Sequence, residues 1–348
     1  MMTHTLNLHW SEELIQFLEK ETGLSFSTLT VQKLAGDASS RLYWRISAIR
    51  PSHSKKNWVL LETEPFLEPK DQFPYINIQT HLLQYQVHVP HIYAVAPSLG
   101  VLLVEDFGDN SLEKVTQKLS PKQYGKYYFL ALDELFKIHF EASKPNPRCL
   151  AFGLAFDTEK LLWELNFMKE HLMKRHLHLT LSSQEEKTLQ SSFLHLCKTL
   201  DAQPRYFTHR DYHSRNLMIQ DEKICILDFQ DARMGPCHYD LASLLKDSYV
   251  QLPKELQEEL LKYYLFEKNK REGKQTDPKE FQKIFDWMCI QRNLKAMGTF
   301  GYLHVEKGKY NYLPYLKPTW NSVRENLEKF SEFKELYALL QKCFKELS

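Results

Sequence analysis

The stretch Phe207-Thr208-His209-Arg210-Asp211-Tyr212-His213-Ser214-Arg215-Asn216 decides how this sequence is interpreted, together with Ile224-Cys225-Ile226-Leu227-Asp228-Phe229 just after it. The first stretch contains H-R-D-x-x-x-x-N, and the second is a short apolar strand that ends on an aspartate. Together they supply one carboxylate that can accept a proton, and an amide and a second carboxylate that can ligate Mg²⁺. Phosphoryl transfer from a nucleotide requires this set of groups.

The spacing of these residues assigns a chemical task to each of them. Asp211 is expected to align an acceptor hydroxyl and take its proton, while Arg210 and His209 hold the loop around it. Asn216 and Asp228 offer amide and carboxylate oxygens, which a hard cation such as Mg²⁺ prefers as ligands. The alternative is a capped loop in an unrelated α/β protein, which the number of matching positions disfavours.

Length and composition limit the classes of protein to be considered. The 348 residues accommodate two domains, and the net charge of +1 gives no electrostatic footprint for nucleic acid. No apolar run approaches the roughly 18 residues of a membrane span, and the start of the chain lacks the pattern of an export signal. The six cysteines are scattered without a C-x-x-C pair, which is typical of a reduced, cytoplasmic protein.

The order of the predicted elements divides the chain into a β-rich first part and a helical remainder. Strand patterns cover Leu29–Leu34, Leu42–Ile49, Trp58–Glu62, Ile92–Val95, Val101–Glu105, Leu217–Gln220 and Lys223–Leu227. Long helices are expected to begin at about Ser120, Asp157, Ser183, Asp240, Pro253 and Pro278, with a helical tail from Trp320. Gly235-Pro236 is expected to turn the chain. The sequence therefore predicts an α+β fold with an N-terminal lobe over residues 1–107 and a larger helical lobe over residues 108–348.

Two places in the N-terminal lobe are candidates for contacts with a nucleotide. The turn before the second strand contains Ser39, Ser40 and Arg41, and its small residues let backbone N–H groups approach phosphate oxygens. A plain hairpin loop is the alternative interpretation. The fifth strand ends in Glu105-Asp106-Phe107, where an exposed backbone can hydrogen-bond a purine edge, unless this is an ordinary strand end.

The length of chain after Asp228 bears on the acceptor. The helix that contains Asp240 follows within a dozen residues, which leaves no room for the long segment that positions a peptide in protein kinases. A small-molecule acceptor is therefore expected. Candidate substrate contacts are Trp287 and Gln291, which share a helix face with Lys295, and also Arg292 and Asp231. An aromatic ring, an amide and cationic groups suit a sugar, although this face of the helix can instead be packed against the catalytic loop.

At these positions the chain resembles the aminoglycoside phosphotransferase family, which has a protein-kinase-like fold of two lobes. The family-wide likeness lies in His209 to Asn216 and in Leu227-Asp228-Phe229-Gln230-Asp231-Ala232. Further stretches are similar to one branch, the anomeric kinases of N-acetylmuramate and N-acetylglucosamine in cell-wall recycling. These are Gly36–Arg41, Leu103–Asp109, His209–Leu245 and Trp287–Phe300.

The resemblance implies a role for each matching residue. Asp211 would be the catalytic base, Asn216 and Asp228 the Mg²⁺ ligands, and ATP or GTP the phosphate donor. Ser39 and Ser40 would face the phosphates, and Glu105 to Phe107 would form the hinge that binds the base through its backbone. Asp240 would tie its helix to the catalytic loop, a role that is compatible with a helix cap. The partners are then a nucleotide and a small-molecule sugar.

The chain also departs from the pattern of kinase-like folds. These folds usually carry a lysine on the third strand and a paired glutamate on the next helix, yet Trp58–Glu62 has no lysine and Tyr75–Gln86 has no acid. Arg41, Arg45 and Lys70 are candidate replacements. Two alternatives therefore stay open beside an amino-sugar kinase. One is a kinase of an aminoglycoside, choline or another amino alcohol, and the other is a catalytically weak, nucleotide-binding pseudokinase.

Overall fold

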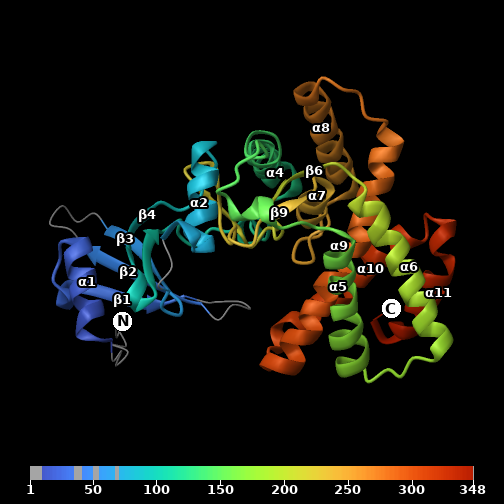
Figure 1. Cartoon of the computed structure of the whole chain (residues 1–348), viewed down its shortest axis with the longest axis horizontal. Helices are drawn as coiled ribbons and strands as arrows, with labels where there is room; N and C mark the ends of the chain where they lie inside the picture. The colour runs from blue at the N-terminus through green and yellow to red at the C-terminus, as the bar shows by residue number, and fades with distance from the viewer. Residues whose placement is uncertain (1–9, 35–40, 50–54, 67–69, 348) are drawn as a thin grey trace. The chain divides into compact units, whose positions relative to one another are not determined.

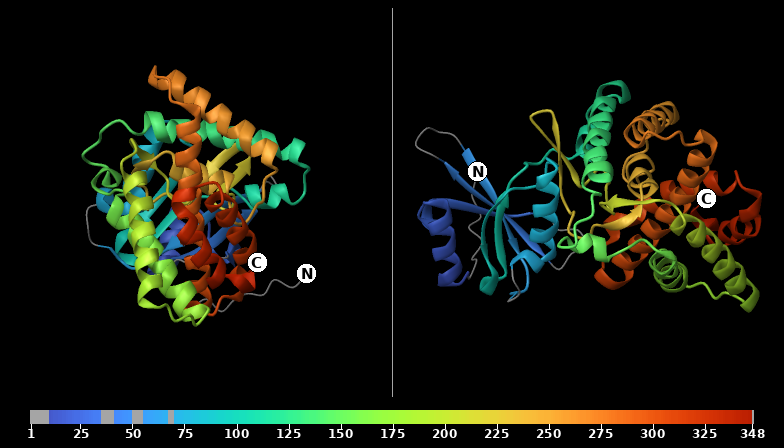
Figure 2. Two further views of the ribbon diagram at one scale, coloured as in Figure 1. Left: turned by 90° about the vertical axis from the view of Figure 1, so that its right-hand side faces the viewer. Right: turned by 45° about the horizontal axis from the view of Figure 1, so that its top comes forward.

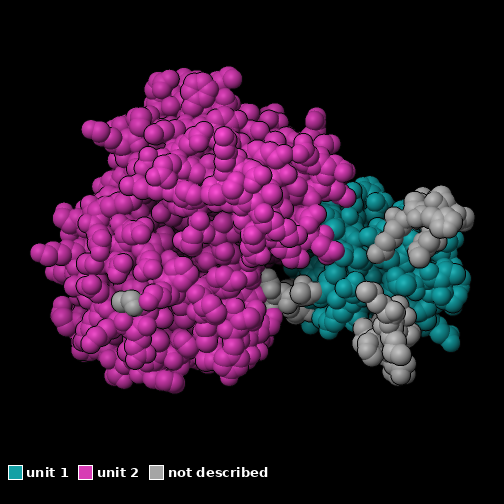
Figure 3. Space-filling model, turned by 180° about the vertical axis from the view of Figure 1, so that it is seen from behind, with its two compact units in different colours: residues 1–76, 90–108 teal, residues 77–89, 109–348 magenta. Residues whose placement is uncertain are grey.

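The computed structural model describes residues 10–34, 41–49, 55–66 and 70–347. The chain divides into two compact units, residues 1–76 with 90–108 and residues 77–89 with 109–348, which Figure 3 colours separately. This division lies next to the lobe boundary predicted after residue 107, but segment 77–89 belongs to the second unit. The reason is helix α2 (Pro74–Gln84), whose Asn77 donates to the carbonyl of Arg148 at 2.8 Å and whose His81 contacts the carbonyl of Ala142 at 2.8 Å.

The first unit is an antiparallel sheet of five strands in the order β1-β2-β3-β5-β4. The strands are β1 (Leu29–Lys33), β2 (Leu42–Ile49), β3 (Lys55–Glu62), β4 (Ile92–Ala96) and β5 (Val101–Glu105). Helix α1 (Glu12–Thr22) packs on one face of the sheet (Figures 1 and 2). Its Leu14 and Leu18 join Trp44, Ile46 and Leu60 in a hydrophobic core.

The second unit is mainly helical. Its helices are α3 (Leu112–Thr116), α4 (Pro121–Phe136), α5 (Thr158–Met168), α6 (Ser183–Asp201), α7 (His238–Leu245), α8 (Lys254–Glu272), α9 (Pro278–Lys307), α10 (Leu316–Leu327) and α11 (Lys334–Cys343). Two helices continue as π-helical segments, α4 through Lys137–Glu141 and α5 through Lys169–His176. Helix α9 is the central element, because α5, α7 and α10 all pack against it (Figure 1).

Short elements complete the described chain. The 3₁₀ segments are Phe26–Thr28, Lys70–Gln72, Pro97–Leu99, Leu150–Gly153, Tyr310–Tyr315, Ser331–Phe333 and Lys345–Leu347. In the second unit two strand pairs flank the catalytic stretch, β6 (Arg205–Thr208) with β9 (Arg233–Pro236) and β7 (Leu217–Gln220) with β8 (Lys223–Ile226). Within the described ranges, no helix combines the length and the hydropathy that a membrane crossing requires.

One local prediction is wrong. Gly235 and Pro236 do not turn the chain but lie in β9, paired with Tyr206 and Arg205 of β6. Gly235 is needed there for a close approach, because a Cβ at this position would lie 2.7 Å from the ring of Phe156. The helix predicted to begin at about Ser183 is α6, which does begin there. Its N-cap is Ser182, and Glu185 closes the capping box. Ser182 and Ser183 both have an acid three residues later, so the pattern alone does not choose between them.

Candidate active site

One buried carboxylate fixes the backbone of the catalytic loop, which lies between β6 and β7. Asp240 lies in the first turn of α7 and is fully buried. It accepts the backbone N–H of His209 at 2.7 Å and that of Arg210 at 2.9 Å, and it also contacts Nε2 of His139 at 3.1 Å. Hydrogen bonds to a charged acceptor are stronger than neutral ones. The prediction that Asp240 ties its helix to the catalytic loop is confirmed.

The backbone is strained on both sides of this site. Arg210 has a φ of 87° and Asp228 a φ of 62°, in the left-handed region that residues other than glycine rarely adopt. Such conformations cost about 1–3 kcal/mol each and persist only where the surroundings enforce them. Here His209 connects the two strained segments, because its Nε2 lies 3.0 Å from the carbonyl of Leu227. The expected anchoring role of His209 is therefore visible as a side-chain contact to backbone.

The second half of the catalytic loop is fixed by two further contacts. Asp247 accepts the backbone N–H of Ser214 at 2.9 Å and its hydroxyl at 2.5 Å. Arg215 donates to both carboxylate oxygens of Glu113, at 3.0 and 3.1 Å, and to the hydroxyl of Tyr315 at 2.8 Å. These contacts restrain the backbone of the loop between Asp211 and Asn216.

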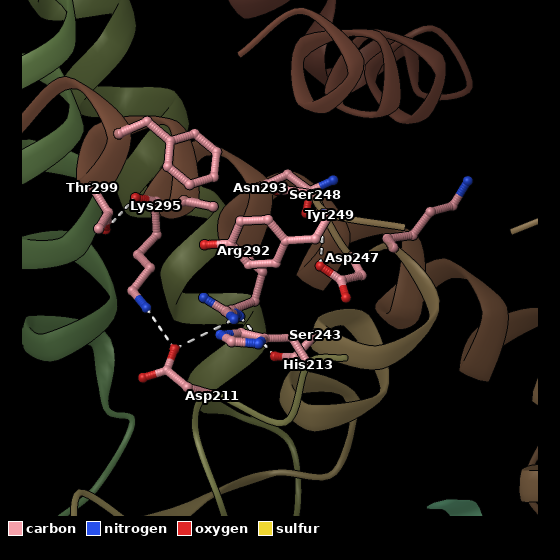
Figure 4. A pocket seen from close by; sticks show the side chains of 13 residues that line it. Asp211, His213, Ser243, Asp247, Ser248, Tyr249, Arg292, Asn293, Lys295 and Thr299 are labelled. Carbon is pink, nitrogen blue, oxygen red and sulfur yellow. Dashed lines mark hydrogen bonds and ion pairs between the residues drawn. The ribbon is translucent and has the colours of Figure 1, made fainter. Parts of the chain in front are cut away.

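Asp211 lies among three cations, as Figure 4 shows for two of them. Its Oδ1 is 2.9 Å from Nζ of Lys295 and 3.5 Å from Nη2 of Arg292, and its Oδ2 is 3.7 Å from Nε of Arg210. Burial alone would raise the pKa of Asp211, but the three positive charges outweigh burial and hold the pKa well below its ordinary value. Asp211 is therefore an ionised hydrogen-bond acceptor at neutral pH.

Asn216 and Asp228 lie side by side, which is what a shared cation requires. The amide nitrogen of Asn216 donates to the carbonyl of Asp211 at 3.0 Å and lies 3.4 Å from Oδ2 of Asp228. The amide oxygen is then the atom of Asn216 suited to a cation. Gln230 donates to the other oxygen of Asp228 at 2.7 Å. An amide oxygen and a carboxylate fit Mg²⁺, which proteins typically bind through one or two carboxylates plus substrate phosphates. In the described part of the chain no cluster of three His, Cys, Asp or Glu side chains offers another metal site.

An open pocket of about 470 Å³ adjoins Asp211. It is lined mainly by the end of α7, the segment after it and α9 (Figure 4). The lining residues are Asp211, His213, Ser243, Lys246, Asp247, Ser248, Tyr249, Arg292, Asn293, Lys295, Ala296, Thr299 and Phe300. Burial lowers the pKa of His213 to about 3 and raises the pKa of Asp247 to about 6. The wall of the pocket is rich in polar groups, and its cations are Lys246, just after α7, and Arg292 and Lys295 of α9.

The predicted substrate contacts are separated by the structure. Arg292 lines the pocket and donates to the hydroxyl of Ser243 at 2.8 Å. Asp231 is half exposed and lies beside the catalytic loop, 3.5 Å from Nη1 of Arg210. Trp287 and Gln291 do not line the pocket, because both are buried between helices.

The expected stacking of a sugar on Trp287 is corrected by these positions. The ring of Trp287 is only 2% exposed and packs edge-on against Phe330 and Phe333. Gln291 is fully buried and donates to Glu164 at 3.0 Å. These two residues are packed inside the unit, against Glu164 of α5 and against Phe330 and Phe333, and not against the catalytic loop as the alternative had it.

The predicted nucleotide contacts belong to the first unit. Ser39 and Ser40 lie outside the described residues, and Arg41 directly precedes β2. At the end of β5, Asp106 forms a two-point ion pair with Arg45 of β2, at 2.6 and 2.9 Å, and both side chains are at least nine-tenths buried. Arg45 thus holds the residue after β5, which differs from the phosphate contact considered for it. Phe107, the residue after Asp106, is buried, and Glu105 accepts the backbone N–H of His91 at 3.2 Å.

Sequence reasoning missed two buried acids near the site. Asp247 lies seven residues after Asp240, a spacing of about two turns in the helix expected there; in the structure it follows the end of α7 and still contacts the catalytic loop. That spacing was a usable signal. Glu164 stands in the apolar run of α5 between Leu161 and Leu165, and an acid on a buried helix face is itself unusual.

Comparisons with known proteins agree with this geometry. The model of a phosphotransferase enzyme family (APH) matches residues 30–274. The chain is 30% identical over 311 residues to an N-acetylmuramate/N-acetylglucosamine kinase of Neisseria meningitidis serogroup B, covering 88% of each protein. It is also 30% identical to a protein of that name from Pseudomonas aeruginosa, covering 88% of this chain and 86% of that protein.

Solved structures show the same fold. An ADP-bound aminoglycoside phosphotransferase has a TM-score of 0.57 at 15% identity, and the match covers 90% of this chain and 97% of that one. A choline/ethanolamine kinase family protein of Mesorhizobium loti has a TM-score of 0.58 at 15% identity, covering 95% and 99%. The fold is therefore protein-kinase-like, as predicted. On the family match and the two relatives at 30% identity, the chain belongs to the APH phosphotransferase family.

Proposed function

We propose that this protein is a Mg²⁺-dependent kinase that transfers the γ-phosphate of ATP or GTP to a hydroxyl of an amino sugar, of the N-acetylmuramate/N-acetylglucosamine type. The observation that carries the proposal is the ionised carboxylate of Asp211 at an open pocket beside the Asn216–Asp228 pair. The names of the relatives at 30% identity support the choice of acceptor.

The reaction assigns a task to each residue of the pocket. Asp211 accepts a hydrogen bond from the acceptor hydroxyl and so aims its oxygen. The new O–P bond forms as the bond from the γ-phosphorus to the bridging oxygen breaks, and the hydroxyl proton passes to Asp211. The depressed pKa of Asp211 makes it a weak base, so the proton moves late, in keeping with a loose transition state. Asn216 and Asp228 would hold Mg²⁺, which when bound neutralises charge on the donor phosphates.

The charge on the transferred group also has partners in the second unit. Lys295 and Arg292 both lie within 3.5 Å of Asp211, beside the place where the acceptor oxygen would sit. Preorganised cations at this place stabilise charge that spreads over the phosphoryl oxygens in the transition state. In this proposal they contribute neutralisation that kinase-like folds usually draw from a lysine on the third strand.

The charge of the pocket favours this acceptor over an amino alcohol or an aminoglycoside. Its lining holds three cationic side chains, Lys246, Arg292 and Lys295, against the two acids Asp211 and Asp247. A polycationic acceptor would meet repulsion there, whereas neutral N-acetylglucosamine or anionic N-acetylmuramate would not. The pseudokinase alternative is disfavoured because the base, the amide and the metal aspartate are all present.

The test is phosphate transfer to a panel of acceptors, read by mass spectrometry of the product. The panel contains N-acetylmuramate, N-acetylglucosamine, glucosamine, choline and an aminoglycoside, each with Mg²⁺ and either ATP or GTP. We expect a phosphorylated N-acetyl sugar. Turnover of choline or the aminoglycoside, with none of the sugars, would refute the proposed acceptor, and no transfer to any compound would support the pseudokinase instead.

A further inference from the structure

Behind the pocket, one buried carboxylate joins three helices. Glu164 of α5 is 1% exposed. It accepts the hydroxyl of Tyr239 of α7 at 3.0 Å and the side-chain amide of Gln291 of α9 at 3.0 Å. Both partners are neutral, although burying a carboxylate away from water is unfavourable unless charges or strong hydrogen bonds compensate. This arrangement raises the question of what offsets the charge of Glu164.

The compensation comes from the cations around Asp211, and Lys160 and Arg233 also interact electrostatically with Glu164. Three positive side chains, Arg210, Arg292 and Lys295, surround that single carboxylate, so the cluster has an excess of positive charge. The negative charge of Glu164 raises the pKa of each of the three. Glu164 therefore lies close enough to act on all of them electrostatically, although it forms no ion pair with any residue that the structure describes.

Contacts lead from Glu164 to the reacting carboxylate by two routes. The first runs through Tyr239, whose ring centroid lies 5.0 Å from the guanidinium carbon of Arg292. Arg292 in turn reaches Asp211. The second runs through Gln291, which immediately precedes Arg292 and lies one turn before Lys295 on α9. A change at Glu164 thus acts on Arg292 and Lys295, the two pocket cations on α9.

We propose that Glu164 is a positioning residue of phosphoryl transfer. Its buried charge holds Tyr239 and the turn of α9 from Gln291 to Lys295 so that Arg292 and Lys295 point at Asp211 as charged groups. This inference rests on the proposed function for its effect on rate. Its electrostatic part can be measured without any acceptor.

The test is Glu164→Gln, which keeps the shape of the side chain and removes the charge. The variant can retain its hydrogen bond to Gln291. Oε1 of Gln291 has no hydrogen-bond partner among the described residues, so the Gln291 amide can rotate and accept from the amide that replaces the carboxylate. We expect kcat to fall about tenfold, the order of effect that network residues outside a site produce, with KM changed less. A purely structural role would leave the titration of Lys295 where it is.

The readout that separates these roles is the pKa of Lys295. Burial lowers this pKa, Arg292 and Arg210 lower it further, and Asp211 and Glu164 raise it, while His213 beside them is neutral. Removing the charge of Glu164 must therefore lower the pKa of Lys295 below its wild-type value. NMR of ¹³Cε-labelled lysine measures it directly, with the signal assigned by its loss in Lys295→Arg. The alkaline limb of kcat should move to lower pH by the same amount.

A matched control is Asp286→Asn, which makes the same kind of change at a different buried acid, on α9 instead of α5. Asp286 pairs with Lys329 at 2.9 Å and does not line the pocket. We expect it to leave the pKa of Lys295 unchanged. An unchanged Lys295 titration in Glu164→Gln overturns the proposal, and so does a shifted titration with unchanged kcat. If the wild-type protein phosphorylates no acceptor, the proposed function fails, while the NMR titration still decides the electrostatic role of Glu164.

Discussion

At the scale of single residues, the site is a balance of charges rather than a lone base. Asp211 is ionised because Lys295, Arg210 and Arg292 lie within 3.7 Å of its oxygens. The spacing H-R-D-x-x-x-x-N predicts Asp211 and Asn216, because the residues involved lie within one loop. It does not predict the contact between Asp211 and Lys295, which are separated by 84 positions in sequence and meet only through tertiary packing.

Lys295→Met should change both rate and pH dependence. Losing the nearest cation removes stabilisation of the ionised carboxylate, so the pKa of Asp211 rises from its depressed value. The wild-type acid limb of kcat/KM from Asp211 lies below the ordinary value of about 3.9, and in the variant it moves to higher pH. We expect kcat to fall by about 10²-fold, in the range of electrostatic stabilisation by one group. Lys295→Arg keeps the charge and should keep the acid limb, and an unmoved limb in Lys295→Met would contradict this account.

Asp228→Asn should raise the requirement for Mg²⁺. Asparagine tolerates the left-handed backbone at φ 62°, so the fold is kept while one negative ligand is lost. We expect the Mg²⁺ concentration for half-maximal activity to rise about tenfold or more, measured by titrating the metal at fixed nucleotide. The control is Asp221→Asn, another aspartate with positive φ, in the turn between β7 and β8. Equal metal requirements in wild type and Asp228→Asn would remove Asp228 from the metal site.

At the scale of elements, helix α9 supplies much of the pocket lining and also packs against the neighbouring helices α5, α7 and α10. Its start at Pro278 and its apolar period were predictable, because caps and periodicity are local. Which face it turns to the pocket was not predictable. Trp287 and Gln291 share a helix face with Lys295 in sequence, yet α5 covers Gln291 and Phe330 and Phe333 cover Trp287, while Lys295 stays at the pocket. A face read from one sequence does not reveal which neighbour covers it.

Gly298→Ala should destabilise the protein through the contact of α9 with α5. A Cβ at Gly298 would lie 2.5 Å from Cα of Met168, a backbone atom that cannot move alone. Overpacking of this kind costs about 1–3 kcal/mol, which lowers Tm by several degrees. Gly125→Ala in α4 is the matched control, because its Cβ would meet only the flexible Leu256 at 3.5 Å. That change should be neutral or stabilising, since alanine is the better helix former. Thermal unfolding of both variants checks this, and equal Tm values would contradict the packing argument.

At the scale of the whole molecule, the two units differ in what the sequence reveals about them. The family match covers residues 30–274, whereas Arg292 and Lys295 lie on α9, beyond its end. The loop residues Asp211, Asn216 and Asp228 lie in the matched part, whereas two of the three pocket cations, Arg292 and Lys295, lie outside it. The strands of the first unit were predictable from alternating patterns and apolar runs in the sequence. The buried pair of Arg45 and Asp106 joins positions 61 residues apart, so only the folded structure reveals it.

The central claim is tested most directly by one measurement. Wild type and Asp211→Asn are incubated with Mg²⁺, a nucleotide donor and N-acetylmuramate or N-acetylglucosamine, and the phosphorylated sugar is quantified by mass spectrometry. We predict product with wild type and a rate about 10²- to 10⁴-fold lower with Asp211→Asn, the loss expected for a general base. Equal product formation by the two proteins, or none from either sugar with wild type, would contradict the account.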